Sequence, residues 1–224
     1  MILPSIIVMG EAQTIAETLP GVSEERRRAM LAVARAMFLE QGYARTSMSA
    51  VAARIGGSKT TLWTYFPGKE ALFLAVSSDL IEEYAGHIAA QLVIDGPLDH
   101  CLNRFGRNLL TALTSPPITA LMRIVTAEAK AIPGLGIRFH EQGLAHGWQR
   151  MANFLSEAQA RGLVRDDADC FRAAQHLIGM FHSGCYQRHL MSDSGSPDAA
   201  TIAADVDAAV DAFCRAYGAV DAAG

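Results

Sequence analysis

The residues whose chemistry is easiest to interpret lie in one stretch, from Thr46 to Phe66. It reads T-S-M-S-A-V-A-A-R-I-G-G-S-K-T-T-L-W-T-Y-F and brings hydroxyl, aromatic and cationic side chains close together. Hydroxyl groups can hydrogen-bond to base edges or phosphates, threonine methyl groups can contact thymine, and a lysine can pair with a phosphate. The stretch is therefore a candidate for nucleic-acid recognition.

Two short helices would position these side chains. Apolar residues recur every three to four positions between Met48 and Ile55, which predicts a helix with one buried face, capped by Thr46 or Ser47. Gly56–Gly57 can adopt the positive φ that commonly ends a helix, and Ser58 can then cap the next one. This is the spacing of a helix-turn-helix.

The second helix has two distinct sides. With Leu62 at the centre of the buried side, Phe66 lies about 40° away, whereas three threonines lie between roughly 160° and 260°. Trp63 and Tyr65 lie near 100° and 300°, on the flanks where a helix in a groove would meet phosphates. The threonine side is therefore the candidate for base contacts.

Charge is divided unevenly along the chain. The 224 residues have a formal net charge of −4, but residues 24–70 contain eight basic and four acidic side chains, a net of +4. The remainder is therefore −8. A basic region joined to an acidic one suits a protein that contacts phosphates at one end only.

These residues resemble the TetR-like family of transcriptional regulators. The matching positions are Gly42–Tyr43, the run from Ser58 to Phe66, and Lys69, while Gly57, Thr60 and Trp63 depart from the commonest residues and bear on the turn and the operator sequence. The resemblance implies a repressor that binds a pseudo-palindromic operator as a homodimer and is released by a small-molecule effector. The predicted DNA-binding residues are Thr46, Lys59, Trp63, Tyr65 and Lys69 for phosphates, Ser58 as the helix cap, and Thr60, Thr61 and Thr64 for bases.

Helical periodicity continues through the rest of the chain, with no alternation typical of strands. A helix is predicted from about Glu24 to Gly42, a long one from Lys69 to about Leu92, and further segments over 102–113, 118–131, 135–161, 167–191 and 202–217. We expect an all-α chain with an N-terminal three-helix DNA-binding domain and a larger C-terminal ligand-binding and dimerisation domain. The predicted boundaries are 1–21 for an N-terminal extension, 22–68 for the DNA-binding domain and 69–220 for the C-terminal domain.

Two sets of apolar residues in the C-terminal region have two interpretations each. Aromatic and methionine side chains can line an effector cavity or simply fill the core. That set is Phe105, Met122, Phe139, Trp148, Met151 and Phe154. The apolar faces of the last two segments can form a dimer interface, as the resemblance implies, or pack within one protomer. That set is Phe171, Ile178, Phe181, Cys185, Ile202, Val206, Val210, Phe213 and Tyr217.

Other functional classes find little support in the sequence. The four cysteines form no C-x-x-C pair and the seven histidines form no i, i+4 pair, so neither a metal nor another cofactor is expected. No phosphate-binding glycine loop, G-x-S-x-G or H-E-x-x-H sequence indicates an enzyme, and no uncharged apolar run is long enough to span a membrane. We expect a cytoplasmic regulator, with a helical enzyme or an adaptor lacking specific DNA binding as the alternative.

Overall fold

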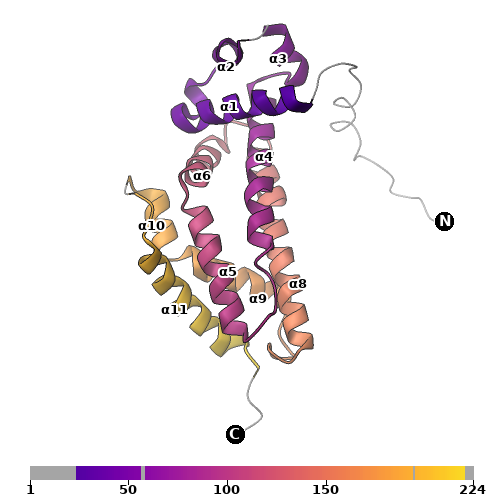
Figure 1. Ribbon diagram of the computed structural model, residues 1–224, viewed down its shortest axis with the longest axis vertical. Helices are drawn as coiled ribbons and strands as arrows, with labels where there is room; N and C mark the ends of the chain where they lie inside the picture. Colours follow the sequence, from indigo (N-terminus) through magenta and orange to yellow (C-terminus); the bar gives the residue numbers. More distant parts are fainter. Residues whose placement is uncertain (1–23, 57–58, 194, 220–224) are drawn as a thin grey trace, which may run out of the picture. The chain divides into compact units, whose positions relative to one another are not determined.

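The computed structural model describes residues 24–56, 59–193 and 195–219, except for the side chain of Lys59. These residues form helices joined by short turns, with an isolated bridge between Val164 and Gly218 as their single strand-type pairing (Figure 1). The predicted all-α fold is confirmed. The predicted N-terminal extension, 1–21, lies outside the described residues. Contacts divide the chain into two compact units, and the boundary between them in the sequence falls between Val76 and Ser77.

The N-terminal unit contains α1 (Glu24–Arg45), α2 (Met48–Ile55), α3 (Lys59–Tyr65) and the first two turns of α4 (Lys69–Ala89). Its core is apolar, because Phe38, Val51, Leu62 and Phe73 are almost completely buried. The ring of Phe73 lies edge-on to that of Phe38, with centroids 5.1 Å apart. This contact explains why the unit ends within α4 rather than at Gly68, where the domain boundary was predicted.

Gly42 interrupts α1 where the sequence predicts the end of the first helix. Its φ of 81° and ψ of 167° are non-helical, and a further turn up to Arg45 follows it. A positive φ is readily adopted only by glycine. The bend turns the chain toward α2, whose first residue comes three positions after Arg45.

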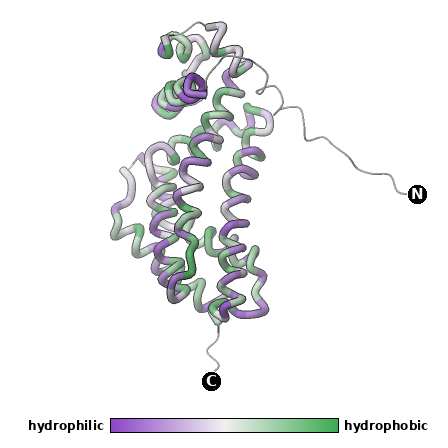
Figure 2. Tube along the Cα trace, turned by 45° about the vertical axis from the view of Figure 1, so that its right-hand side comes forward, coloured by the Kyte–Doolittle hydropathy of each residue, from purple (hydrophilic) through white to green (hydrophobic). Residues whose placement is uncertain are grey.

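The C-terminal unit is a bundle of helices around a single apolar core. It contains the rest of α4, then α5 (Leu98–Leu113), α6 (Pro116–Glu128), α7 (Leu135–Phe139), the π-helix η1 (His140–Ala145), α8 (His146–Ala160), α9 (Cys170–His182), α10 (Cys185–Met191) and α11 (Ala199–Tyr217). α5 packs along α11, α11 packs against α9, and α9 packs along α8. Hydrophobic and hydrophilic residues alternate along these helices, as expected when each buries one face (Figure 2).

Two predicted helical segments are broken. Residues 135–161 form α7, η1 and α8 in place of one α-helix, because the backbone adopts a π-helical turn over His140–Ala145. Residues 167–191 are divided by Gly184, whose φ of 93° and ψ of −128° end α9 and start α10. The Asp205 carboxylate of α11 accepts a hydrogen bond from the backbone N–H of Cys185 at 2.7 Å and so holds this break in place.

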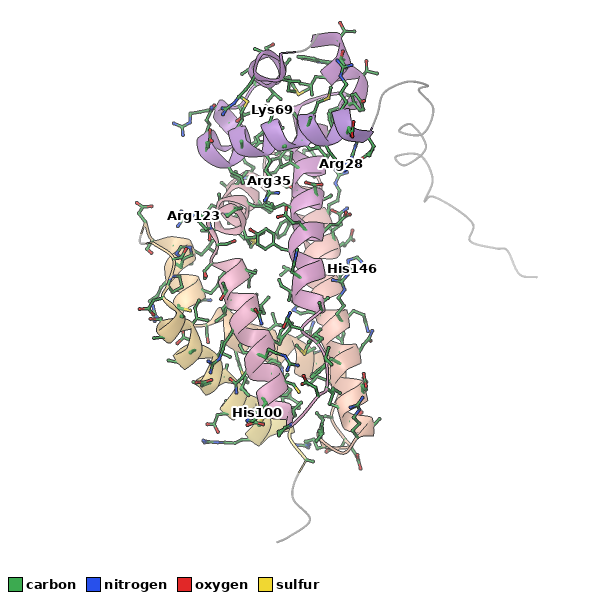
Figure 3. The ribbon with its side chains drawn as sticks, in the orientation of Figure 1. Arg28, Arg35, Lys69, His100, Arg123 and His146 are labelled. Atoms are coloured by element: carbon green, nitrogen blue, oxygen red, sulfur yellow. The ribbon has the colours of Figure 1, made fainter. Side chains whose placement is uncertain are left out.

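Polar contacts fasten α10 to α6. The Arg123 guanidinium, labelled in Figure 3, donates to the backbone carbonyls of His189 and Leu190, each at 3.0 Å. The ring Nε2 of His189 also lies 3.0 Å from the Thr119 hydroxyl oxygen, with both side chains buried. The two bonds donated by the Arg123 guanidinium are charge-assisted, and such bonds are stronger than neutral ones. Side chains therefore tie the C-terminal end of α10, a helix of seven residues, to α6.

Candidate nucleic-acid interface

The connection between α1 and α2 is held by two hydroxyl groups. Ser47 is the N-cap of α2, and its oxygen accepts a hydrogen bond from the N–H of Ala50 at 3.1 Å. Thr46 is only 1% exposed, and its hydroxyl donates to the Gly42 carbonyl at 2.9 Å. The prediction that Thr46 contacts phosphate is wrong, because its side chain is buried and bonded within the protein.

The turn between α2 and α3 begins as predicted. Gly56 is left-handed, with φ 73° and ψ 17°, and its N–H donates to the Ala53 carbonyl at 3.2 Å. Such a glycine is a common helix C-terminus. The predicted cap, Ser58, lies outside the described residues, as does the side chain of Lys59, so these two remain predictions.

Helix α3 has one face in the core and the opposite face exposed. Leu62 and Phe66 are 1% and 4% exposed and fix the helix on the N-terminal unit. Thr60 and Thr64 are exposed, and so is Trp63, at 39%. Thr61, which was predicted to share the outer face, is half-buried. The surface available to a ligand is therefore narrower than the threonine pattern suggested.

The hydroxyl of Thr64 already has one partner. It donates to the backbone carbonyl of Thr60 at 2.9 Å, one helical turn earlier. A hydroxyl has a single hydrogen, so the oxygen of Thr64 remains an acceptor. In the major groove an acceptor can bond the amino groups of adenine or cytosine, and the methyl group can contact thymine.

Tyr65 does not match its predicted role. Its hydroxyl oxygen is buried and has no hydrogen-bond partner among the described residues. Its ring stacks on that of Phe66, with centroids 6.1 Å apart and planes 29° apart. A phosphate contact would need the hydroxyl at the surface, so the structure contradicts this prediction. The single aromatic residue that α3 exposes widely is Trp63.

Lys69 makes contacts within the N-terminal unit. Its Nζ lies 4.1 Å from the centroid of the Tyr43 ring and donates to the Ala44 carbonyl at 3.3 Å. The two motif positions Tyr43 and Lys69 thus contact each other, which fixed spacing in the sequence could not show. A lysine ammonium has three donors, so further donors remain for a phosphate. Lys69 and Arg28, both labelled in Figure 3, belong to this unit's basic residues.

Exposed ion pairs engage some of the other basic residues. Arg54 lies 3.7 Å from Glu40, and Arg27 lies 3.5 Å from Glu24, with all four side chains at least 40% exposed. Exposed pairs contribute little stability, on the order of 0–1 kcal/mol. These arginines can therefore exchange a carboxylate for a phosphate at small cost.

The predicted dimer residues belong largely to the core of the protomer. Seven of the nine are buried there, namely Ile178, Phe181, Cys185, Ile202, Val206, Val210 and Phe213. Phe171 is 41% exposed, whereas Tyr217 is half-buried and its hydroxyl lies 2.5 Å from the ring Nδ1 of His176. The apolar faces of α9 and α11 pack against the protomer's own helices, so these seven residues contribute mainly to the core of the protomer.

The predicted effector residues are also mostly core. Phe105, Met151 and Phe154 are at most 5% exposed and pack in the central cluster, and Trp148 is half-buried against it. Met122 and Phe139 are half-buried too. A groove of about 460 Å³ lies elsewhere, between α4 and the end of α5, and none of the six residues lines it. Its lining comes from two helices and the turn after one of them, so periodicity along a single helix did not indicate it.

Burial raises the pKa of two of the thiols. Desolvation, followed by the neighbouring Asp205 carboxylate, raises the pKa of the buried Cys185 thiol to about 11, and burial also raises the pKa of Cys214. Thiolates are the reactive form of cysteine. Among the described residues, no three His, Cys, Asp or Glu side chains are grouped in a way that could hold a metal ion.

No single helix in the described part of the chain is both long and apolar enough to cross a membrane. One bent pair, α5 with α6, passes that test by length and composition, with 67° between its two members. The buried face of α5, which includes Leu102 and Leu110, packs in the core of the C-terminal unit.

Comparisons with known proteins agree with this architecture. Residues 100–219 match the C-terminal domain of AefR-like transcriptional repressors, and residues 30–76 match the tetR family of bacterial regulatory proteins. The HTH-type transcriptional repressor ComR of Escherichia coli is 27% identical over 154 residues, which are 67% of this chain and 73% of ComR.

Solved structures are similar over most of the chain. A TetR-family regulator from Mesorhizobium loti superposes with a TM-score of 0.80 and 28% identity, covering 87% of this chain and 97% of the other. The flavonoid-responsive regulator FrrA superposes with a TM-score of 0.72 and 28% identity, covering 88% and 98%. With its exposed α3 and two matching domains, the chain belongs to the TetR family of DNA-binding transcriptional regulators.

Proposed function

We propose that the protein is a homodimeric repressor that places α3 of each protomer in the major groove of a pseudo-palindromic operator. The observation that carries this proposal is the arrangement of α3, in which Leu62 and Phe66 anchor the helix while Thr60, Trp63 and Thr64 face outward. A helix-turn-helix reads DNA with such an exposed second helix, and dimers bind two half-sites related by symmetry.

Base readout in this proposal is modest. The outer face of α3 has no arginine, asparagine or glutamine, the residues that make bidentate base contacts. Thr64 offers an acceptor and a methyl group, because its hydrogen is bonded to the Thr60 carbonyl. We expect A·T pairs at the contacted positions, read by the adenine amino group and the thymine methyl. DNA shape would supply additional specificity.

Phosphate contacts would come from the edges of the same unit. Trp63 is exposed on the flank of α3, and Lys69 is held at the start of α4 with donors to spare. Lys59 and Ser58, at the other end of α3, complete the proposed set. Each phosphate contact releases counterions, so binding should weaken steeply as salt is raised.

The proposed dimer face uses the outer sides of α9 and α11. Phe171 is 41% exposed, and a Cβ built on Gly179 would meet nothing within 4 Å apart from its chain neighbours and the backbone of its own helix. On α11, exposed alanines recur every four residues at Ala200, Ala204 and Ala208. Small residues permit close approach of a second helix. These positions replace the buried residues as the candidates for the interface.

The proposed regulation needs a ligand that discriminates between two dimer states. Moving an equilibrium from 1:99 to 99:1 requires about 10⁴-fold tighter binding to one state, or roughly 5.5 kcal/mol. The similarity to a flavonoid-responsive regulator supports a small aromatic effector. With no membrane-crossing helix in the described residues and a DNA ligand, the cytoplasm is the compartment we propose.

Fluorescence anisotropy tests the DNA-binding proposal. A labelled duplex from the protein's own promoter region is titrated with protein at several salt concentrations, with random duplex as competitor. We expect two protomers per duplex and binding at least about 10³-fold tighter than to random DNA. Thr64→Val should weaken specific binding about 2- to 10-fold and leave random-DNA binding unchanged.

Thr126→Val is the matched control. Thr126 is also exposed on a helix and donates its hydroxyl hydrogen one turn back, to the Met122 carbonyl at 2.8 Å, but it lies on α6. Equal affinity for the promoter duplex and for random duplex would refute specific operator binding. An equal effect of the two valine substitutions would refute the role given to α3.

A further inference from the structure

The groove between α4 and the end of α5 lies wholly within the C-terminal unit. Its volume of about 460 Å³ is within the range of pockets for small organic molecules, roughly 300–1,000 Å³. One wall comes from α5 and the turn after it, and the other from the last turns of α4 and the residues that follow. The hydrogen bonds that the side chains of each wall already make determine which ligands fit.

Two hydroxyl groups of the α5 wall have already used their hydrogens. Thr111 donates its hydroxyl hydrogen to the Arg107 carbonyl at 2.7 Å, and Ser115 donates its own to the Ala112 carbonyl at 2.6 Å. A hydroxyl has only one hydrogen, so both oxygens can accept a hydrogen bond from a ligand but cannot donate one. This wall therefore favours a ligand that carries donors.

Asn108 places a further acceptor beside Thr111. Its side-chain N–H donates to the Arg104 carbonyl at 2.8 Å, and since a carbonyl can only accept, this bond identifies the nitrogen of the amide. The amide oxygen is then an acceptor. Asn108 and Thr111 are both exposed, and side chains three residues apart on a helix are neighbours, with Cβ atoms about 5–6 Å apart. A ligand with two donors on one ring can therefore bond both.

The α4 wall is flat and largely apolar opposite these acceptors. Tyr84 and Ile88 are one helical turn apart in α4, and both are half-buried. An aromatic ligand can stack on the Tyr84 ring. The Tyr84 hydroxyl oxygen is 3.5 Å from that of Ser115, so the two walls meet at that end.

We infer that this groove binds a neutral aromatic ring that carries two hydroxyl groups. The hydroxyl groups donate to Thr111 and Asn108, while the ring lies on Tyr84 and Ile88. An ether on the same ring has no hydrogen to donate, so it would displace water from these acceptors without replacing the hydrogen bond. Glu83 also belongs to the lining, but it already has an interaction within the protein, and no ligand contact is assigned to it.

The inference rests on the proposed function in one respect, namely that the hydroxylated ring is the effector that controls DNA binding. Its chemistry does not depend on that role. The groove, its acceptors and its apolar wall all belong to the C-terminal unit, so ligand binding can be measured on the full chain without DNA.

Three probes that differ only in methylation test the inference. Resorcinol has two hydroxyl groups, 3-methoxyphenol has one, and 1,3-dimethoxybenzene has none. Each is titrated into the ¹⁵N-labelled full chain at pH 7, and amide shifts in ¹H–¹⁵N NMR spectra give both the affinity and the location. We expect a Kd of about 1 mM for resorcinol, as suits a ligand of so few atoms.

The order of the three affinities is the decisive result. Each lost donor should weaken binding by about 2- to 10-fold, so resorcinol should bind most tightly and 1,3-dimethoxybenzene least. Methylation also adds apolar surface, so a groove that selected ligands by hydrophobic burial alone would give the opposite order.

Three variants test the groups named. Thr111→Val should weaken resorcinol by about 2- to 10-fold and leave 1,3-dimethoxybenzene unchanged, whereas a general disturbance of α5 would weaken both. Tyr84→Leu should weaken all three probes, because each lies on its ring. Thr126→Val is the control, since Thr126 makes the same kind of hydrogen bond one turn back but lies on α6, outside the lining.

The results separate this inference from the proposed function. The opposite order of affinities, an equal effect of Thr111→Val on resorcinol and 1,3-dimethoxybenzene, shifts confined to residues away from the groove, or no binding at about 20 mM would overturn the inference. Specific operator binding in the same preparation would then leave the repressor proposal standing. Resorcinol binding with the expected variant effects but no operator binding would overturn the repressor proposal alone.

Discussion

Gly106 lies where three helices of the C-terminal unit meet, and replacing it with alanine is the sharpest test of the packing. A Cβ at this position would lie 2.7 Å from Cζ of Phe181 on α9 and 2.8 Å from Cγ1 of Val206 on α11. Real Cβ atoms essentially never approach this closely. Both neighbours are buried, so neither can move without disturbing the core.

The expected magnitude is a balance of two terms. Alanine favours the helix by about 1 kcal/mol relative to glycine. Overpacking a tight core costs about 1–3 kcal/mol, and contacts below 3 Å to two side chains place Gly106→Ala at the upper end. We expect the free energy of unfolding to fall by about 1–2 kcal/mol.

Urea denaturation followed by circular dichroism measures this change, with Gly147→Ala as the control. Gly147 is exposed in α8, and a Cβ built on it would meet nothing within 4 Å apart from its chain neighbours and the backbone of its own helix. Alanine there should therefore stabilise the protein by about 0.5–1 kcal/mol. Val206→Ala removes one of the clashing groups, so it should cost less in the Gly106→Ala background than alone. If Gly106→Ala stabilises as much as Gly147→Ala, the close approach of α5 to α9 and α11 is refuted.

Three further predictions concern single side chains. Lys69→Met should lower the free energy of unfolding, measured in urea without DNA, by about 0.5–1.5 kcal/mol. The substitution removes the hydrogen bond to the Ala44 carbonyl and the contact of the ammonium group with the Tyr43 ring. An unchanged free energy of unfolding would mean that the lysine serves DNA binding alone. Phe213→Ala should lower the free energy of unfolding by about 3–5 kcal/mol, since the ring is completely buried in the protomer. Phe171→Ala should change that free energy little and should shift sedimentation toward the monomer. The reverse result would restore the original interface assignment. Burial lowers the pKa of His182 below 6.5 in the folded protein, so the unfolded chain binds this proton at a higher pH than the folded chain does. The free energy of unfolding should therefore fall as the pH drops below about 6.5. His182→Asn should remove this part of the fall when urea midpoints are measured over a pH series, and an identical pH profile would contradict the prediction.

The local features of the helix-turn-helix could be predicted from sequence because they depend on neighbours along the chain. Gly56 ends α2 with a left-handed backbone, and Leu62 and Phe66 face the core as their angular spacing indicated. Thr46 was misassigned because a threonine before a helix looks the same in sequence whether its hydroxyl faces solvent or the carbonyl of Gly42. Tyr65 was misassigned because helical angles do not say which flank is buried.

The C-terminal unit was harder to predict for a physical reason. Periodicity shows that α9 and α11 each bury a face, but it does not say whether the partner belongs to the same protomer. In the structure, the partner of these faces lies in the same protomer, since the rings of Phe181 and Phe213 are completely buried there. The π-helix and the break at Gly184 depend on tertiary contacts, such as the bond from Cys185 to Asp205 across twenty residues. The groove was missed because its lining comes from two different helices, and periodicity shows only the faces of one helix at a time.

Selection of binding sites from a pool of randomised duplexes tests the central claim most directly. The purified protein is incubated with the pool, bound duplexes are recovered and sequenced, and the selection is repeated with Thr64→Val. A homodimer that reads DNA with α3 should enrich an inverted repeat, and Thr64→Val should relax the preference at one symmetric pair of positions. Failure to enrich any motif, or a motif without two-fold symmetry, would contradict the claim that this chain is a dimeric operator-binding repressor.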